Sequence, residues 1–377
     1  MENTSSPQID RSKIDPRSGE NRDLNHDQSW HENLLTGVSR TFALTIPQLP
    51  SGLREAVTNA YLLCRIADTI EDDPLLGPDT KDRLHRSFLQ AVTTGRGAVA
   101  FAADLAPMLA PNTLAAEVEL IEESPRVLQI TRGMHSRQRI AIQRCLDTMS
   151  RGMAHFARSR NRDGLADVVE FERYCYFVAG VVGEMLTELF CDYSPEIDAN
   201  RDQLAPRAVS FGLGLQMTNI LKDIWDDLEQ GTCWLPRDVF DRHGYDLREL
   251  APNHNGNGPA FAASMLDLVG IARGHLREAL AYTSAIPSNE TGIRRFLIWA
   301  VLLAVSTLGK ISNDPLFTSG TQVKVTRPRV AAIIAGSSAL IRSNDGLTKL
   351  FNTAGRGLSL ETANPAPARI RKETTTP

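Results

Sequence analysis

Apolar residues recur at helical spacing along nearly the whole of this chain of 377 residues. A repeat of about 3.6 residues places them on one face of a helix, where they can pack into a core. The strict alternation of a half-buried strand is scarce, and the Val-Lys-Val run at 323–325 is a short exception. The pattern therefore predicts an all-α protein. The expected helices are at about 29–37, 40–46, 52–73, 79–94, 113–122, 136–157, 168–190, 202–227, 235–242, 259–284, 289–312 and 329–352.

One folded all-α domain is expected over residues 29–352, because this part of the chain contains no fixed-period repeat and no obvious linker. Residues 1–28 are polar and lack the apolar core of a signal peptide. Residues 353–377 are rich in Pro, Ala and Thr. We expect both ends to be disordered.

The composition argues against several classes of function. A formal net charge of −4 without a long basic stripe indicates no nucleic-acid partner. Five scattered cysteines without metal-ligand spacing predict buried free thiols in a reducing compartment, so we expect a cytoplasmic protein. No run reaches the roughly 18 apolar residues of a membrane-spanning helix, and the best candidate, 296–308, is expected in the core.

Two acidic clusters lie where a buried helix would normally be apolar. They consist of Asp68, Glu71 and Asp72 in the first and of Asp223, Asp226 and Asp227 in the second. Residues four apart share a helix face, and partly buried like charges there are costly unless a cation lies between them. Carboxylates on two helices that face one cavity suit Mg²⁺, which binds a few carboxylates, waters and substrate phosphates. The clusters therefore predict chemistry on a diphosphate.

Each acidic stripe continues along its helix with other polar groups. Tyr61 and Arg65 extend the first stripe at helical spacing, and Gln216 and Asn219 extend the second. A polar seam on an otherwise apolar helix is either its solvent face or the lining of an enclosed site. One cluster alone would favour the solvent face, but two similar stripes favour an enclosed site.

The segment 172–183 combines aromatic and small residues. Gly180 and Gly183 each weaken a helix by roughly 1 kcal/mol relative to alanine. They either allow two helices to pack closely or leave room for an apolar ligand chain. Tyr174 is either a core tyrosine with a satisfied hydroxyl or a phenol that faces the reacting carbon.

Together these stretches resemble the squalene and phytoene synthase family, the head-to-head trans-isoprenyl diphosphate synthases. The matching blocks are Ser39-Arg40-Thr41-Phe42, Tyr61 through Arg65 to Asp72, Tyr174 to Gly183, and Gln216 through Asn219 to Asp227. Their order and spacing fit over about 30–330. The resemblance implies the isoprenoid synthase fold, a single domain of helices around a central cavity.

Within this family the chain is most similar to the squalene synthases, especially the bacterial ones, because DTIEDDP at 68–74 resembles their first acidic motif. The segment around Lys324 resembles the part of squalene synthases whose basic residues approach NADPH. Thr326 stands there in place of another expected basic residue, although Arg327 follows. The Cys-Trp-Leu-Pro stretch at 233–236 is closer to carotenoid-type synthases. These departures concern the reductive half-reaction and not the fold.

The resemblance implies a farnesyltransferase that joins two farnesyl diphosphates into presqualene diphosphate with Mg²⁺ and then reduces it to squalene with NADPH. It implies catalytic roles for Tyr174, Asp68, Asp72, Asp223 and Asp227. Metal binding is implied for Asp68, Glu71, Asp72, Asn219, Asp223 and Asp227. Substrate binding is implied for Ser39, Arg40, Phe42, Tyr61, Arg65, Gln216, Asn219 and Lys222, and cofactor binding for Lys324 and Arg327. A lipid product further implies peripheral contact with the membrane.

Several alternatives stay open at this point. Lys222 could be a solvated lysine instead of a diphosphate ligand, and Glu71 and Asp226 could support the metal ligands instead of binding metal. The enzyme could be a phytoene or dehydrosqualene synthase, or it could stop at presqualene diphosphate or release hydroxysqualene. A di-iron bundle ranks low because the Glu-x-x-His pairs it needs do not occur. A helical scaffold would explain the helices but not the two acidic stripes.

Overall fold

The computed structural model describes residues 30–39, 41–251 and 258–358. Within these ranges the predicted all-α fold is confirmed, since the only β pairing is an isolated bridge between Leu165 and Pro236.

Residues 30–38 form a first helix. The α-helices that follow are α2 (Phe42–Thr45), α3 (Ser51–Asp72), α4 (Pro78–Thr94), α5 (Ala98–Leu105), α6 (Ala115–Glu122), α7 (Ser124–Gly133), α8 (Ser136–Ser159), α9 (Val168–Cys175), α10 (Val181–Tyr193), α11 (Pro195–Asp198), α12 (Arg201–Glu229), α13 (Arg237–Asp241), α14 (Pro259–Ala285), α15 (Thr291–Asn313), α16 (Arg327–Ala339) and α17 (Asn344–Ala354). Short 3₁₀ turns are η2 (Ile46–Gln48), η3 (Ala106–Met108) and η5 (Leu247–Glu249), and η4 (Tyr176–Gly180) is a π-helical turn.

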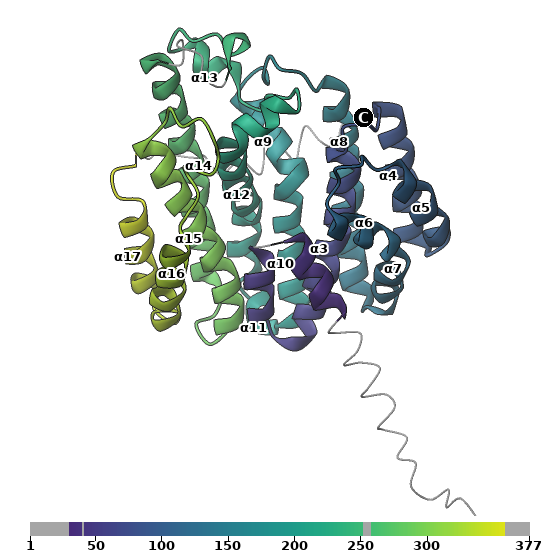
Figure 1. The fold of residues 1–377 in the computed structure, drawn as a ribbon. Helices are drawn as coiled ribbons and strands as arrows, with labels where there is room; N and C mark the ends of the chain where they lie inside the picture. Colours follow the sequence, from purple (N-terminus) through teal and green to yellow (C-terminus); the bar gives the residue numbers. More distant parts are fainter. Residues whose placement is uncertain (1–29, 40, 252–257, 359–377) are drawn as a thin grey trace, which may run out of the picture.

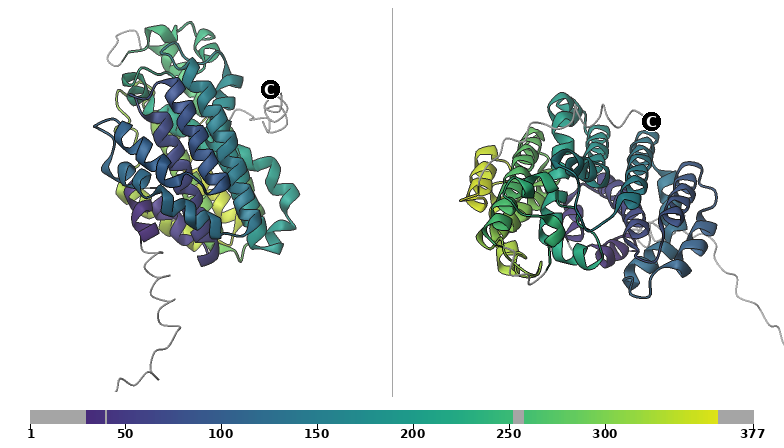
Figure 2. Two further views of the ribbon diagram at one scale, coloured as in Figure 1. Left: turned by 90° about the vertical axis from the view of Figure 1, so that its right-hand side faces the viewer. Right: turned by 90° about the horizontal axis from the view of Figure 1, so that it is seen from above.

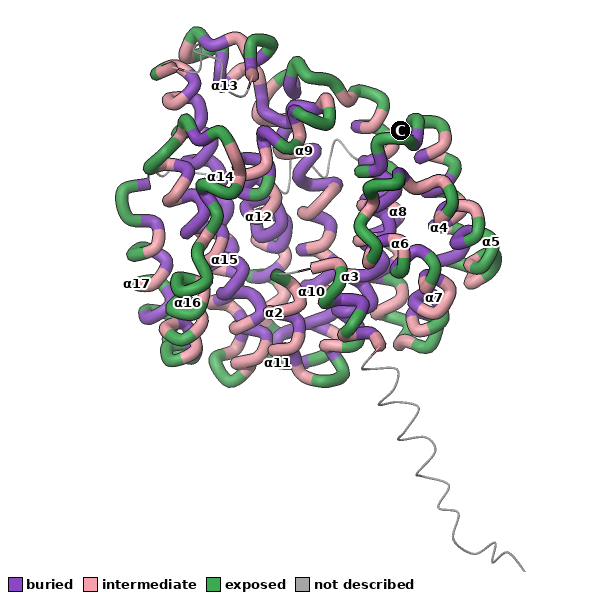
Figure 3. The backbone as a smooth tube through the Cα atoms, in the orientation of Figure 1, coloured by how far each residue is buried: buried purple, intermediate pink, exposed green. Residues whose placement is uncertain are grey.

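The long helices run side by side in one bundle (Figure 1). Helix α3 packs against α8, α10 packs against α8 and α12, and α12 packs against α14 and α15. Figure 2 shows the same helices from the side and end-on, with α16 and α17 at one edge and α4 to α7 at the other. Buried residues follow the facing sides of the central helices in Figure 3, whereas the outer helices carry more exposed positions.

The two helices that carry the acidic clusters begin and end close to their predicted limits. Helix α3 starts after Pro50, and the chain turns to an extended conformation at Asp73, directly before Pro74. Proline has no backbone N–H to continue a helix, and it disfavours helical geometry in the residue before it. Helix α12 ends just before Gly231. The backbone φ of Gly231 is 79°, a left-handed conformation that glycine adopts without steric strain because it has no Cβ atom.

The structure divides one of the expected helices, and it places a π-helical turn inside another that is otherwise continuous. The helix expected at 168–190 is α9 and α10 joined by the π-helical turn η4, and π-turns often mark functional sites. The helix expected at 329–352 breaks after Ala339, and α17 restarts with the Ser343 hydroxyl accepting a hydrogen bond of 3.0 Å from the Gly346 N–H. Three short α-helices, α5, α7 and α11, were not predicted, and the Val-Lys-Val run forms a turn and not a strand.

A fully buried arginine holds the break between α16 and α17 in place. Arg294 on α15 donates to the Ile341 carbonyl at 2.7 Å and to the Asn344 side-chain oxygen at 2.6 Å. It also donates to the carbonyls of Thr283 and Ile286 at 3.4 and 2.7 Å, at the end of α14. The last carbonyls of a helix lack partners within it, so this one side chain satisfies the end of α14 and orders the α16–α17 connection.

Two helical stretches of the described chain are long and apolar enough to cross a membrane by length and composition, Val168–Tyr193 and Thr291–Asn313. The predicted core segment 296–308 lies inside the second. In each stretch 72% of the apolar window is buried inside the protein, which is the behaviour of core helices. The described fold continues to Leu358, which is buried and lies beyond the expected limit at 352.

Candidate active site

One cavity of about 490 Å³ collects most of the side chains that the sequence singled out. From α3 come Tyr61, Arg65, Asp68, Glu71 and Asp72, and from α12 come Gln216, Asn219, Asp223 and Asp227. Phe42 and Tyr174 also line it. The two acidic stripes therefore face one enclosed space from two helices that are distant in sequence.

Other predicted residues lie outside this lining. Ser39 borders the cavity, and its hydroxyl accepts a hydrogen bond of 3.0 Å from the Phe42 N–H. The centroid of the Phe42 ring lies 5.1 Å from that of the Tyr61 ring. Lys222 forms an ion pair with its neighbour Asp223 beside the cavity. Lys324 and Arg327 are exposed and do not line it. Arg40 lies outside the described residues.

The rest of the cavity wall is largely apolar. Besides the acids and amides, it is lined by aliphatic, thioether and aromatic side chains: Ile46, Val57, Met149, Met153, Val178, Val182, Leu186, Phe211, Leu215 and Phe296. One end of the space is thus acidic and the remainder is hydrophobic. Such a cavity fits a ligand with a charged head and a long apolar chain.

Helix α12 approaches both α10 and the turn η4 closely along this wall. A Cβ added at Gly183 would lie 2.0 Å from the Ala208 carbonyl oxygen, and one at Gly212 would lie 2.2 Å from that of Ala179. Both glycines also line the cavity, whereas Gly180 faces only neighbouring side chains. Close helix packing therefore explains Gly183, and the same absence of a side chain keeps the cavity open there.

The acidic side chains are enclosed enough to change their titration. Burial raises the pKa of Asp68 to about 7 and that of Glu71 to about 8, although the positive charges of Arg65 and Lys81 oppose the rise. Burial, with the Asp223 and Asp72 carboxylates, raises the pKa of Asp227 to about 7. The side chain of Asp72 is accessible to water in the cavity. The protein around it nevertheless removes part of the water that would solvate its charge, and this raises its pKa. The charged forms are therefore unfavourable without a cation.

The donor set fits a divalent cation that binds together with a diphosphate. Both carboxylate oxygens of Glu71 are buried and have no hydrogen-bond partner among the described residues. Across the described ranges, no three His, Cys, Asp or Glu side chains come close enough to form a preformed metal site. Mg²⁺ is usually held by one or two carboxylates together with waters and substrate phosphates, so it does not require a complete protein cage.

Loss of stability on raising the pH is the first expected outcome of this arrangement. These carboxyls titrate near pH 4 in the unfolded chain and near 7 to 8 in the folded one, so the folded state binds more protons between these values. The free energy of unfolding of the metal-free protein should then fall by at least about 2 kcal/mol as the pH rises from about 5 to 8, since one such group alone contributes about that much. Mg²⁺ binds the ionised groups, so its effect on Tm should be larger at pH 8 than at pH 6. Thermal unfolding at both values, against NaCl of matched ionic strength, tests this, and equal Mg²⁺ effects would contradict it.

Tyr174 is fixed by aromatic packing. Its ring stacks on Trp234 with centroids 3.9 Å apart, and the Phe156 ring meets it edge-on at 5.1 Å. Burial, followed by the negative charges of Glu71, Asp72 and Asp227, raises the pKa of Tyr174 well above its usual value. Its hydroxyl therefore stays protonated, so Tyr174 can donate a hydrogen bond into the cavity but does not supply a phenolate base.

Two of the cavity residues that sequence reasoning missed bear on its chemistry, Trp234 and Arg160. Trp234 lies in a stretch noted only for its similarity to carotenoid-type synthases, and nothing there predicted its stacking on Tyr174. Arg160 follows the last turn of α8 in a polar run with several arginines, where helical periodicity gives no signal. It nevertheless lines the cavity and donates to the Thr232 hydroxyl.

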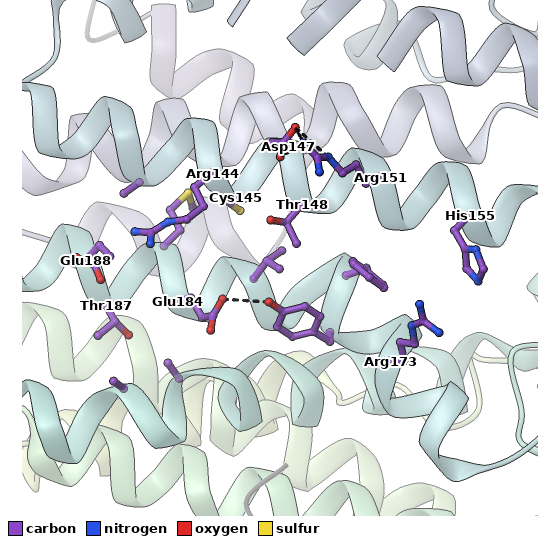
Figure 4. Close-up of a pocket in the computed structure, with 17 residues that line it drawn as sticks. Arg144, Cys145, Asp147, Thr148, Arg151, His155, Arg173, Glu184, Thr187 and Glu188 are labelled. Atoms are coloured by element: carbon purple, nitrogen blue, oxygen red, sulfur yellow. Dashed lines mark hydrogen bonds and ion pairs between the residues drawn. The ribbon is translucent and has the colours of Figure 1, made fainter. Parts of the chain in front are cut away.

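A larger hollow of about 670 Å³ lies on the other side of α10, between α8 and α10 (Figure 4). None of the predicted site residues lines it. Its acids already have partners: Asp147 pairs with Arg151 at 2.9 Å, Glu188 pairs with Arg201 at 2.9 Å, and Glu184 accepts a hydrogen bond from Tyr176 at 3.3 Å. The smaller cavity, with its unsatisfied acids, is therefore the candidate active site.

Comparisons with known proteins agree on one family. The family model for squalene/phytoene synthase matches residues 35–329. A squalene synthase of Candida albicans is 31% identical over 332 residues, covering 84% of this chain and 68% of that protein. The squalene synthase of Schizosaccharomyces pombe is 28% identical, covering 85% and 67%.

Solved structures show the same fold at lower sequence identity. A complex of TcSQS with the ligand E5700 superposes with a TM-score of 0.68 at 22% identity, covering 88% of this chain and 98% of that one. A dehydrosqualene synthase in complex with a ligand superposes with a TM-score of 0.60 at 21% identity, covering 85% and 99%.

Proposed function

Because this chain belongs to the squalene/phytoene synthase family, we propose that it is a squalene synthase. It joins two farnesyl diphosphates head to head into presqualene diphosphate in a Mg²⁺-dependent reaction, and then reduces this intermediate to squalene with NADPH. The observation that carries the proposal is the single cavity that two acidic helices line at one end and apolar side chains line elsewhere.

Six residues would hold the metal ions: Asp68, Glu71 and Asp72 on α3, and Asn219, Asp223 and Asp227 on α12. When bound with the substrates, Mg²⁺ supplies positive charge that neutralises the diphosphate and the developing charge on the leaving group. Lys222 already pairs with Asp223, so it adds a fixed cation at the edge of the second cluster. The raised pKa values of the acids support this assignment, because such carboxyls gain most from a cation.

The chain's own donors would position the diphosphate for ionisation. Arg65 is held by an ion pair to Glu117 and lies 3.9 Å from Asp68, so its guanidinium is fixed beside the first cluster. Tyr174, still protonated, also lines the cavity and can donate to a diphosphate oxygen. Its ring can also steady a carbocation by a cation–π contact. The released diphosphate is itself a suitable proton acceptor.

The apolar wall would hold the farnesyl chains and exclude water. An allylic or cyclopropylcarbinyl cation reacts with any water that reaches it, so its lifetime depends on a dry cavity. Side chains such as Val57, Met153, Leu186 and Phe211 supply that surface. Gly183 and Gly212 leave space along the wall, because their helices meet backbone to backbone.

NADPH would reach the cavity from the segment that follows α15. The Trp225 indole N–H donates to the Phe317 carbonyl at 2.7 Å, which ties this segment to α12 next to the second acidic cluster. A Cβ added at Gly320 would lie 2.9 Å from the Lys222 carbonyl oxygen. Lys324 and Arg327 are exposed close by in the sequence and can pair with the phosphates of the cofactor.

Product analysis tests the proposal. The protein is incubated with farnesyl diphosphate and Mg²⁺, with and without NADPH, and the products are identified by mass spectrometry. Squalene with NADPH and presqualene diphosphate without it are expected. Dehydrosqualene regardless of NADPH would move the protein to the non-reductive branch, which the substitution of Thr326 for a basic residue favours. Presqualene diphosphate or hydroxysqualene alone would mean that the reductive step is missing.

The Lys324→Ala variant should separate the two half-reactions. If Lys324 pairs with a cofactor phosphate, formation of squalene should fall at least about tenfold, the scale of one lost charge-assisted hydrogen bond. Consumption of farnesyl diphosphate should change little, and presqualene diphosphate should accumulate. Lys349→Ala, at an exposed lysine on α17, is the matched control. Equal loss of both half-reactions in Lys324→Ala would refute a role in cofactor binding.

We also infer that the protein is cytoplasmic and contacts the membrane only peripherally, where an apolar product can leave. All five cysteines are free and buried, which suits a reducing compartment.

A further inference from the structure

The two arginines that line the candidate active site differ in how their charge is used. Arg65 forms an ion pair with Glu117 and lies near Asp68. Arg160 donates to the neutral hydroxyl of Thr232, and within the described ranges no carboxylate lies within ion-pair distance of it. Its guanidinium therefore keeps N–H donors available for an anion in the cavity.

Backbone hydrogen bonds fix the loop that carries Arg160 into the cavity lining. Arg160 directly follows α8, and the next residue, Asn161, accepts a hydrogen bond of 2.9 Å from the Cys233 N–H. Thr232, which holds the guanidinium, donates its own N–H to the Asp227 carbonyl at 2.9 Å. The loop after α8 is thus fastened to the end of α12, next to the second acidic cluster. A side chain anchored in this way loses less entropy when it binds a ligand.

The charge of Arg160 reaches both acidic helices. It opposes the rise in pKa that burial causes at Glu71 and Asp72 on α3 and at Asp227 on α12. Arg65 lies nearer Asp68, and Lys222 is bound to Asp223. Arg160 therefore lies near carboxylates of both clusters.

We propose that Arg160 binds the diphosphate of a prenyl diphosphate substrate and holds it as it leaves. The inference rests on the proposed function. In the ionisation step the bond between the substrate's first carbon and the diphosphate oxygen breaks, and both electrons go to that oxygen. The negative charge on the diphosphate grows in this step, so N–H donors of a permanently charged guanidinium bind it more strongly than they bind the intact substrate. Arg160 would thus be a catalytic residue.

Binding of inorganic diphosphate in the presence of Mg²⁺, measured by titration calorimetry on the full chain, tests this inference. Arg160→Gln should weaken binding at least about tenfold, because it removes charge-assisted hydrogen bonds. Arg160→Lys should recover part of the loss, since it keeps the charge but not the planar fork. Arg158→Gln is the matched control: Arg158 is exposed and pairs with Asp82 at 3.4 Å, so its loss should leave diphosphate binding unchanged.

A second measurement uses the unmutated protein and so does not depend on the variants folding. Phenylglyoxal modifies accessible arginines, and peptide mass spectrometry locates the modified residue. Magnesium diphosphate should protect Arg160 from modification and leave Arg158 unaffected. Equal diphosphate affinity in Arg160→Gln and wild type, or no protection of Arg160, would overturn the inference.

The outcomes also distinguish this inference from the proposed function. If wild type turns over farnesyl diphosphate while Arg160→Gln binds diphosphate normally, only the role of Arg160 is refuted. If diphosphate binds through Arg160 but no prenyl diphosphate reacts, the proposed function is refuted, whereas the role of Arg160 in binding diphosphate is retained. If wild type does not bind magnesium diphosphate at all, both are refuted.

Discussion

Asp68→Asn should lower the rate of Mg²⁺-dependent diphosphate release at least about a hundredfold, because it removes a carboxylate that holds metal in the candidate active site. Asp68 faces the cavity from α3, where burial raises its pKa to about 7. Asparagine keeps the shape of the side chain but cannot neutralise a cation. Asp223→Asn on α12 should have an effect of similar size. Release of diphosphate from farnesyl diphosphate, at saturating Mg²⁺, is the measurement.

The same substitution should leave the fold intact and raise Tm in the absence of metal. At pH 8 Asp68 is largely ionised beside Asp72, and a neutral side chain removes that repulsion. Asp226→Asn is the matched control, since Asp226 is the member of the second cluster that is exposed and does not line the cavity. It should retain near-normal turnover. Near-normal turnover in Asp68→Asn would refute the assignment of the first cluster.

Arg294→Met should destabilise the protein by about 3–5 kcal/mol, the scale expected when a buried charged hydrogen-bond donor is removed from its partners. Three backbone carbonyls and the Asn344 side chain would lose the hydrogen bond from Arg294, and methionine can replace none of these bonds. The break between α16 and α17 should loosen first, because Ile341 and Asn344 lie in it or beside it. Urea unfolding monitored by circular dichroism measures the change.

Arg295→Met provides the comparison for this effect. Arg295 is the next residue of α15 and is only partly buried, so its replacement should change the free energy of unfolding by less than about 0.5 kcal/mol. Similar stability of Arg294→Met and Arg295→Met would show that the buried hydrogen bonds contribute little to the fold.

The acidic stripes could be predicted from sequence because helix geometry alone relates Asp68 to Asp72 and Asp223 to Asp227. Helix limits near Pro50 and Pro74 followed from the backbone chemistry of proline. The two stripes face one cavity because of how α3 and α12 pack, which sequence alone does not determine. The only indication in the sequence was that both stripes carry the same kinds of polar side chain.

Features set by long-range contacts could not be predicted in the same way. The break at 340–343 depends on Arg294, which is distant in the sequence. Arg160 enters the cavity because its loop is bonded to the residues after α12, and Trp234 because it stacks on Tyr174. Lys222 has the right position in the sequence, but its ion pair with Asp223 holds it beside the cavity lining.

The central claim is that the two acidic helices act together on one metal-bound diphosphate, and a double-mutant cycle tests it most directly. Diphosphate release from farnesyl diphosphate is measured at saturating Mg²⁺ for wild type, Asp72→Asn, Asp227→Asn and the double variant. The two carboxylates influence each other across the cavity, since Asp72 helps to raise the pKa of Asp227. If they serve one assembly, the double variant should be about as slow as the slower single variant, because parts of one unit are not additive. If the two losses multiply, the helices act independently and the single-site account is contradicted.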